Sequence, residues 1–197
     1  SFIREGIVIA CRSCSVDIVE NTIEAQITGI NLDFEFWYTV NILRNTINGG
    51  TVGIKVNPQM DYTIFIEGNY IDGAETGISI YADGYGGQGD LVSLSKNTIA
   101  NADIGILFED IFFERDIPSD AGSVQGDQVL WDTHISSMNF LNDTNVAMLV
   151  DVNSALIIQI QDSYFGTTDL EAIGNLITDN ADDYTLGTVS VVNPVSS

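Results

Sequence analysis

Apolar and polar residues alternate in short stretches along the chain, and the same stretch returns about every 24 residues. The motif Gly-Ile-x-apolar occurs at residues 6–9, 29–32, 53–56, 77–80 and 105–108. Alternation with a period of two is typical of β-strands, whose successive side chains point to opposite faces. The pattern therefore predicts a series of equivalent short strands, one in each repeat.

A second motif, apolar-x-x-Asn-x-Ile, follows the first in each repeat. It occurs at residues 18–23, 42–47, 66–71 and 94–99, with the asparagines Asn21, Asn45, Asn69 and Asn97. Each asparagine lies eight residues before the next motif glycine. A buried asparagine at a repeated turn can bond the backbone of its neighbours and the next asparagine along. We therefore interpret these four residues as a structural ladder and not as catalytic groups.

Strands of this length are too short to fold alone, but stacking them at about 4.8 Å per coil buries one continuous apolar column. Parallel pairing between coils then satisfies the backbone polar groups. The motif glycine would occupy a corner, where either a positive φ or close packing favours glycine. The sequence therefore predicts an all-β chain, a parallel β-helix (solenoid) of about six coils.

The last two coils are degenerate. In the fifth, we place Ile135 and Phe140 inward, with Met138 in the asparagine position. A rival register puts Asn139 there, but it forces polar neighbours into the core. In the sixth coil, Ser163 takes the asparagine position.

The two motifs at this period resemble the repeats of the pectin-lyase-like superfamily, over residues 6–165. The resemblance implies a right-handed parallel β-helix, but no single activity, because that superfamily holds lyases, hydrolases, epimerases, adhesins and phage proteins. Residues 164–189 resemble a segment that often follows such repeats in bacterial extracellular proteins. This resemblance implies an extracellular or cell-surface location.

The chain is expected to form one domain, with coils over residues 1–165 and a C-terminal cap over residues 166–197. Thr168 and Glu171 are spaced as a capping box, which predicts a short helix over residues 169–177. That helix and a final strand near residues 187–192 would cover the last coil and prevent edge-to-edge growth.

The N-terminal end lacks a comparable capping pattern, because residues 1–5 lead almost directly into the first Gly-Ile strand. Terminal repeats usually need a polar cap. We expect that preceding coils have been removed or that this end packs against another chain, and we favour the first of these.

The net charge of the chain limits the kinds of molecule that it can bind. Six Lys and Arg against 28 Asp and Glu give a formal net charge of −22. This balance excludes nucleic-acid binding and attraction to anionic membranes, and no apolar run is long enough for membrane insertion. Cations, neutral glycans and basic partners remain, although solubility alone would explain the charge equally well.

Two insertions fall at the same point of the repeat, over residues 81–91 and 109–132. They should therefore stack on one edge of the solenoid, which is the usual place for a binding surface. Their acidic and aromatic residues suit a polysaccharide or surface glycan. The candidate binding residues are Asp83, Tyr85, Asp90, Glu109, Asp110, Glu114, Asp116, Asp127 and Trp131.

Clustered carboxylates also suit Ca²⁺, which takes six to eight oxygen ligands. The candidate ligands are Asp83, Asp90, Asp110 and Asp127. A solvated acidic loop that binds nothing is the alternative reading of the same residues.

The resemblance implies that an enzyme of the lyase or epimerase type would neutralise a uronate carboxylate with Ca²⁺, Arg or Lys and then abstract a proton. Arg115 is the one basic residue in an insertion, and Arg115, Asp132 and His134 are the catalytic candidates. A lone histidine beside a loop is more often structural. We therefore expect a non-catalytic extracellular domain of a larger secreted or surface protein, structural or glycan-binding, with a polysaccharide-processing enzyme as the alternative.

Cys11 and Cys14 form a single Cys-x-x-Cys pair in the first coil. One such pair with one histidine cannot make a closed zinc site. A local disulfide would fit an extracellular protein, and two free thiols are the alternative.

Overall fold

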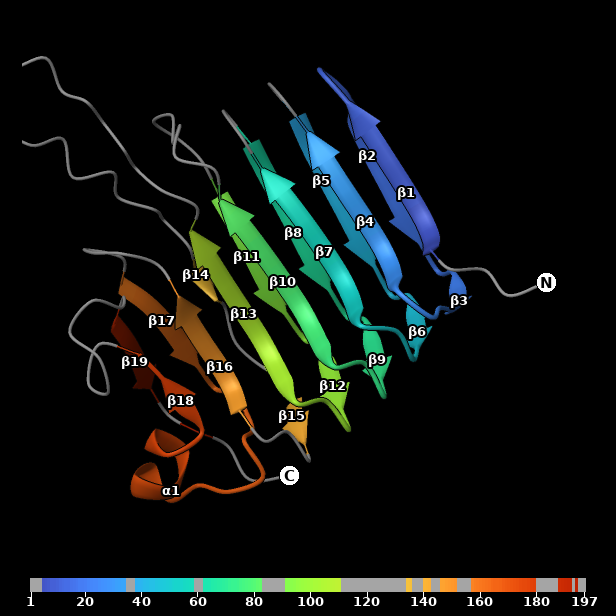
Figure 1. The fold of residues 1–197 in the computed structure, drawn as a ribbon. Helices are drawn as coiled ribbons and strands as arrows, with labels where there is room; N and C mark the ends of the chain where they lie inside the picture. The colour runs from blue at the N-terminus through green and yellow to red at the C-terminus, as the bar shows by residue number, and fades with distance from the viewer. Residues whose placement is uncertain are drawn as a thin grey trace, which may run out of the picture.

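The computed structural model describes residues 5–34, 38–58, 62–82, 91–110, 134–135, 140–142, 146–151, 157–179, 188–192 and 194. Its strands pair in parallel and form stacked sheets (Figure 1). The long sheet has the order β1 (Glu5–Cys11), β4 (Thr28–Phe34), β7 (Val52–Pro58), β10 (Thr76–Ala82), β13 (Ile104–Asp110), β16 (Val146–Asp151) and β18 (Ile177–Thr178).

The other strands of each coil lie in further sheets. The second sheet contains β2 (Ser15–Val19), β5 (Tyr38–Leu43), β8 (Tyr62–Glu67) and β11 (Leu91–Ser95). The third contains β3 (Thr22–Glu24), β6 (Thr46–Asn48), β9 (Tyr70–Asp72), β12 (Thr98–Ala100) and β15 (Phe140–Asn142). The fourth contains β14 (His134–Ile135), β17 (Ile157–Gln161) and β19 (Thr188–Val192).

Consecutive strands belong to different sheets, whereas strands one repeat apart pair with each other. This is the connectivity of a parallel β-solenoid, and the predicted fold class is confirmed. The number of coils differs slightly from the prediction of about six. The solenoid has about four regular turns, β1–β3 through β10–β12, and β13 to β19 continue the stack less regularly.

The core is a set of apolar columns that the register lines up from coil to coil. Ile30, Ile54, Ile78 and Ile106 are successive register partners, and all four are buried. Each such side chain contributes about 1.5–3 kcal/mol by leaving water. The repeat period therefore sets the register, because a slip of one residue would turn every column outward.

The motif glycines allow the coils to approach closely. A Cβ on Gly53 would lie 2.6 Å from the carbonyl oxygen of Gly77 and 2.6 Å from Cγ2 of Ile71. Close packing therefore requires glycine here. Positive φ occurs instead at the corner before the ladder position, where Arg44 has φ 53° and Lys96 has φ 54°.

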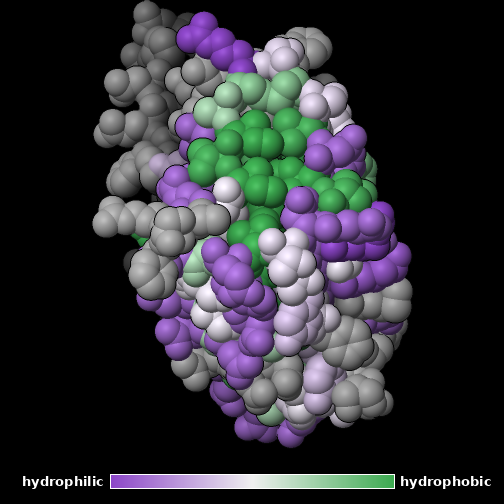
Figure 2. All heavy atoms as spheres, turned by 90° about the vertical axis from the view of Figure 1, so that its right-hand side faces the viewer, coloured by the Kyte–Doolittle hydropathy of each residue, from purple (hydrophilic) through white to green (hydrophobic). Residues whose placement is uncertain are grey.

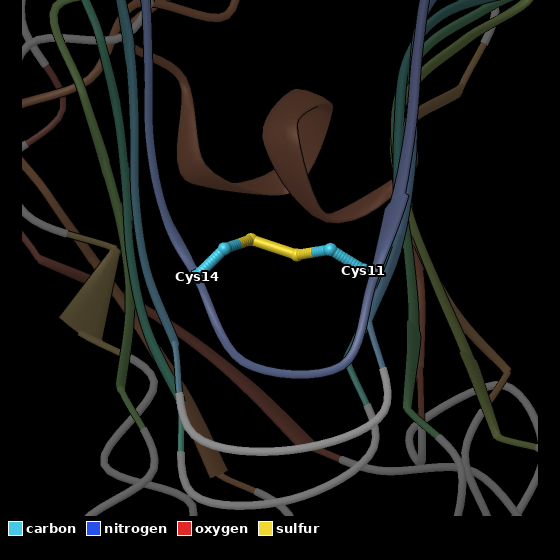
Figure 3. Close-up of a disulfide and its surroundings, with 2 residues drawn as sticks. All are labelled: Cys11 and Cys14. Carbon is cyan, nitrogen blue, oxygen red and sulfur yellow. A yellow bond between two sulfur atoms is a disulfide. The ribbon is translucent and has the colours of Figure 1, made fainter.

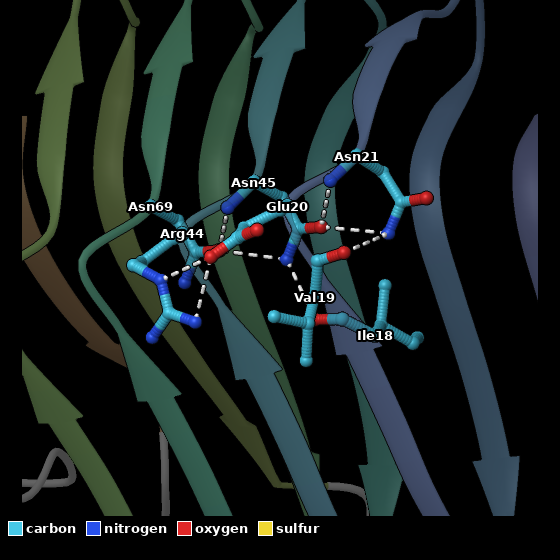
Figure 4. Close-up of polar contacts among 7 residues, drawn as sticks. All are labelled: Ile18, Val19, Glu20, Asn21, Arg44, Asn45 and Asn69. Atoms are coloured by element: carbon cyan, nitrogen blue, oxygen red, sulfur yellow. Dashed lines mark hydrogen bonds and ion pairs between the residues drawn. The ribbon is translucent and has the colours of Figure 1, made fainter.

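Asn21, Asn45 and Asn69 each donate to the asparagine of the next coil. Asn21 and Asn45 are joined by two hydrogen bonds, from the Asn21 backbone N–H (2.9 Å) and Nδ2 (3.0 Å) to Asn45 Oδ1 (Figure 4). The same pair of bonds joins Asn45 to Asn69 and Asn69 to Asn97. The side-chain amides of Asn45, Asn69 and Asn97 also donate to backbone carbonyls of the preceding coil.

In the fifth coil, the prediction that placed Phe140 at the inward position is wrong, because Phe140 lies opposite Thr98 and the next residue lies opposite the core residue of the coil before. Ile135 pairs with the buried Ile160, as the prediction implied, but Leu141 is buried and lies opposite Ile99. Six positions therefore separate Ile135 from Leu141, against five between Leu94 and Ile99. This coil contains one extra residue, so no single copy of the motif fits it.

The cap follows the sixth coil. Ser163 and Phe165 are buried there, and helix α1 (Leu170–Gly174) begins shortly afterwards. Its N-cap is Asp169, whose carboxylate accepts from the backbone N–H of Glu171. The predicted capping residue Thr168 is therefore wrong by one position, and the helix is shorter than 169–177. The predicted final strand is β19, which pairs with β17.

The opposite end of the solenoid is apolar at its centre. Figure 2 looks onto the N-terminal coil and shows a continuous hydrophobic patch framed by hydrophilic side chains. Ile7, Ile9 and Val16 belong to this coil and are only partly buried against the core.

A disulfide joins Cys11 to Cys14 and closes the short connection between β1 and β2 (Figure 3). Both residues pack against the core cluster. Of the two states left open by the sequence, the structure shows the disulfide. The connection after the first strand of a coil spans residues 12–14 in the first coil, 83–90 in the fourth and 111–133 in the fifth, and the last two lie outside the described residues.

Candidate functional site

The candidate site is a polar row on the outer face of the long sheet, made by Asp33, Asn57, Tyr81 and Glu109. These residues come from β4, β7, β10 and β13 and lie at one register position. Each follows a buried core residue, so alternation turns it outward. Neighbouring members of the polar row are therefore separated by one strand spacing, about 4.8 Å.

A second outward row runs beside it, two residues earlier on each strand, and contributes Lys55 and Ser79. Lys55 Nζ lies 5.9 Å from the centre of the Tyr81 ring, within reach of a cation–π contact. The hydroxyl of Ser79 donates to Oε1 of Glu109 at 3.4 Å. These contacts tie two rows and three strands into one group of side chains.

The polar row also contains an amide that its neighbours do not fully satisfy. Asn57 Nδ2 donates to Oδ1 of Asp33 at 3.2 Å. Asn57 Oδ1 is buried and accepts no hydrogen bond from any residue that the structure describes. A buried acceptor without a donor carries a desolvation cost.

Lys55 differs from two other basic residues of the described coils. Arg44 pairs with Glu20 at 2.9 Å, and Lys96 pairs with Glu67 at 2.5 Å, both on exposed parts of the solenoid. No carboxylate among the described residues forms an ion pair with Lys55. Its ammonium group therefore keeps donors available beside an aromatic ring.

This arrangement offers donors from Lys55, acceptors from Asp33 and Glu109, and an aromatic ring from Tyr81. A ligand with hydroxyl groups on a ring matches that mixture. The described residues contain no cluster of three or more His, Cys, Asp or Glu that could hold a metal ion.

The structure places three of the sequence candidates on strands. Glu109 and Asp110 end β13, although they were predicted to open the insertion, because β13 continues to pair with β10 up to Asp110. His134 begins β14 and pairs with Gln159 on β17. It therefore belongs to a strand of the fifth coil.

The remaining candidates lie outside the described residues. They are Asp83, Tyr85, Asp90, Glu114, Arg115, Asp116, Asp127, Trp131 and Asp132. Their segments begin directly after Ala82 and Asp110, one residue beyond Tyr81 and Glu109 of the polar row. The candidate binding, calcium and catalytic roles of these residues stay predictions.

Asn57 and Tyr81 were not among the candidates chosen from the sequence, which offered the strand row of Lys55 and Ser79 only as the next choice after the insertions. The signal for them was present, because Lys55 is the outward residue of a Gly-Ile-x-apolar motif and Asn57 and Tyr81 follow the motif's last position. Reading the outward positions of successive repeats in register would have grouped them.

Comparison with protein-family models, with curated proteins and with solved structures finds no match to this chain. The class that the structure defines is the parallel β-solenoid. In the described part of the chain, no helix has the length and hydropathy needed to cross a bilayer.

Proposed function

We propose that this chain is a non-catalytic extracellular β-helix domain, part of a larger secreted or surface protein, that binds a glycan along the polar row. The observation that carries the proposal is the alignment of Asp33, Asn57, Tyr81 and Glu109 on adjacent strands. A paired sheet holds these groups at fixed spacing, so they need little ordering when a ligand binds.

The proposed location rests on the disulfide, and the proposed kind of glycan rests on the charge of the chain. A disulfide between Cys11 and Cys14 persists in oxidising compartments and is rare in the cytosol. A net charge of −22 favours a neutral glycan over an anionic one, because an acidic polymer would be repelled. The disulfide therefore supports an extracellular or cell-surface domain, and the charge supports a neutral ligand.

The second candidate is a lyase or epimerase acting on a uronate polysaccharide. Lys55 favours it, because a cation beside Tyr81, whose register partner is Glu109, could neutralise a uronate carboxylate near groups that accept and donate protons. A lyase would leave an unsaturated sugar that absorbs in the ultraviolet.

A glycan array tests the first proposal. We expect the wild-type protein to bind a defined set of neutral oligosaccharides and Tyr81→Ala to lose at least about tenfold in affinity, or about 1.4 kcal/mol. Tyr70→Ala is the matched control, because Tyr70 is an exposed tyrosine of the third sheet, on β9. Equal binding by all three proteins, or binding by none, would contradict the proposal.

Uronate oligosaccharides incubated with the same proteins separate the two functions. The non-catalytic account expects no ultraviolet absorbance from unsaturated product. Product formation by the wild type that is lost in Lys55→Ala would support the lyase instead.

A further inference from the structure

The N-terminal face of the solenoid leaves three strands unpaired on one side. β1, β2 and β3 each stand at the end of their sheet. Ile7, Ile9 and Val16 are partly exposed there, whereas their register partners Ile30, Leu32 and Val40 are 0% exposed. The difference is the covering coil, which the second coil has and the first lacks among the described residues (Figure 2).

The asparagine ladder also ends open at this face. In each internal coil, the ladder Oδ1 accepts from the backbone N–H and the Nδ2 of the coil before it. Asn21 Nδ2 donates to Val19 O and Asn45 Oδ1, which fixes the orientation of its amide. No described residue donates to Asn21 Oδ1 (Figure 4).

The rim of the face is acidic. Asp17, Glu20 and Glu24 lie on the first coil, and each accepts from the second coil. The donors are Asn41 at 2.7 Å, Arg44 at 2.9 Å and Asn48 at 2.6 Å. A covering coil with amide or basic side chains at these positions would place donors on both sides of each carboxylate.

We propose that this face docks one further parallel β-coil of the same repeat. That coil would carry an asparagine whose backbone N–H and Nδ2 donate to Asn21 Oδ1, and amide or basic residues above the acidic rim. The interface would continue the one that already joins the first coil to the second. It is independent of the polar row and of the function proposed for it.

A second copy of this chain fits the face less well. Two N-terminal faces brought together would oppose two acidic rims, in a protein of net charge −22. The C-terminal end of a copy presents α1 and β18 in place of a regular coil. Two features therefore favour a coil of the same repeat. They are the acidic rim, which needs donors opposite it, and the direction of the ladder, in which each asparagine donates to the one in the following coil.

The test is to supply that coil. A copy of residues 29–52 joined directly to Gly6 adds one repeat with Asn41, Arg44, Asn45 and Asn48 at the required positions. We expect hydrogen exchange of the β1, β2 and β3 amides to slow at least about tenfold, since edge strands become internal. The matched control is the same extension with Asn45→Ala in the copied segment, in which the slowing should be largely lost.

Three outcomes would overturn the proposal. The first is an added coil that proteases remove readily while β1 exchanges at its original rate. The second is equal protection with and without the copied asparagine, which would remove Asn21 Oδ1 as the recognition element. The third is concentration-dependent dimerisation of the unextended protein that protects β1 to β3, which would make a second copy the occupant.

Discussion

Asn69 Oδ1 accepts two hydrogen bonds from Asn45, one from its backbone N–H at 2.9 Å and one from its Nδ2 at 3.0 Å, although 24 residues separate the two. Both side chains are 1% exposed. The pair satisfies polar groups that the corner would otherwise bury unpaired, and it links the register of one coil to that of the next.

Asn69→Ala should lower the free energy of unfolding by about 1–3 kcal/mol, because it removes the acceptor of the buried Asn45 N–H and the side-chain donor to the Ile42 carbonyl. Chemical denaturation measures the change. Asn48→Ala is the matched control, since Asn48 donates to Glu24 on the exposed surface and should cost at most about 0.5 kcal/mol. Equal losses in both variants would count against the ladder.

Gly53→Ala should destabilise the protein by about 1–3 kcal/mol through overpacking, because the new Cβ would meet backbone of the next coil at 2.6 Å. Gly174→Ala provides the comparison, since nothing lies within 4 Å of a Cβ there. A Gly53→Ala protein with wild-type thermal stability would show that the coils can separate at no cost.

Reduction of the Cys11–Cys14 disulfide should lower stability by at most about 2 kcal/mol, because the loop it closes is short. The fold should survive, since the core columns of the internal coils do not depend on the bond. Thiol titration of the denatured protein should detect no free thiol before reductant and two after it. Free thiols without reductant would contradict the disulfide and weaken the extracellular assignment.

Replacing residues 111–127 by a short glycine-containing turn should leave a folded, β-rich protein. β13 pairs with β10 and β16, and β14 pairs with β17, through residues outside the cut. Loop length itself is thermodynamically cheap, about 0.6 kcal/mol per doubling. We expect weaker glycan binding, because the segment enters beside the polar row. Circular dichroism and the array measure both effects, and failure to fold would place the segment in the core.

The fold could be predicted because the sequence repeats one short pattern whose register is local. The fifth coil could not, because an extra residue between Ile135 and Leu141 shifts the pattern, and only pairing with Ile99 and Ile160 reveals where. The positive φ of Arg44 and Lys96 also lacked a signal, since neither residue type is selected for that conformation. In this conformation the Arg44 N–H donates to the Glu67 carbonyl of the next coil at 2.9 Å.

Less of the candidate site than of the fold could be predicted from the sequence. The candidate residues were taken from the insertions and not from the strands that lead into them. Tyr81 and Glu109 were assigned to loops, but pairing with each other extends both strands past them. Strand ends depend on such long-range pairing, which motif spacing does not report. The outward residues Asn57 and Tyr81 joined the row of Lys55 and Ser79 only once the register of three coils was known.

Calorimetric titration with the best oligosaccharide from the array tests the central claim most directly. The proteins compared are the wild type, Lys55→Ala and Lys96→Ala, where Lys96 is an exposed lysine paired with Glu67 away from the long sheet. The account predicts at least about tenfold weaker binding for Lys55→Ala and unchanged binding for Lys96→Ala. Unchanged binding for both would contradict a glycan site on the outer face of the long sheet.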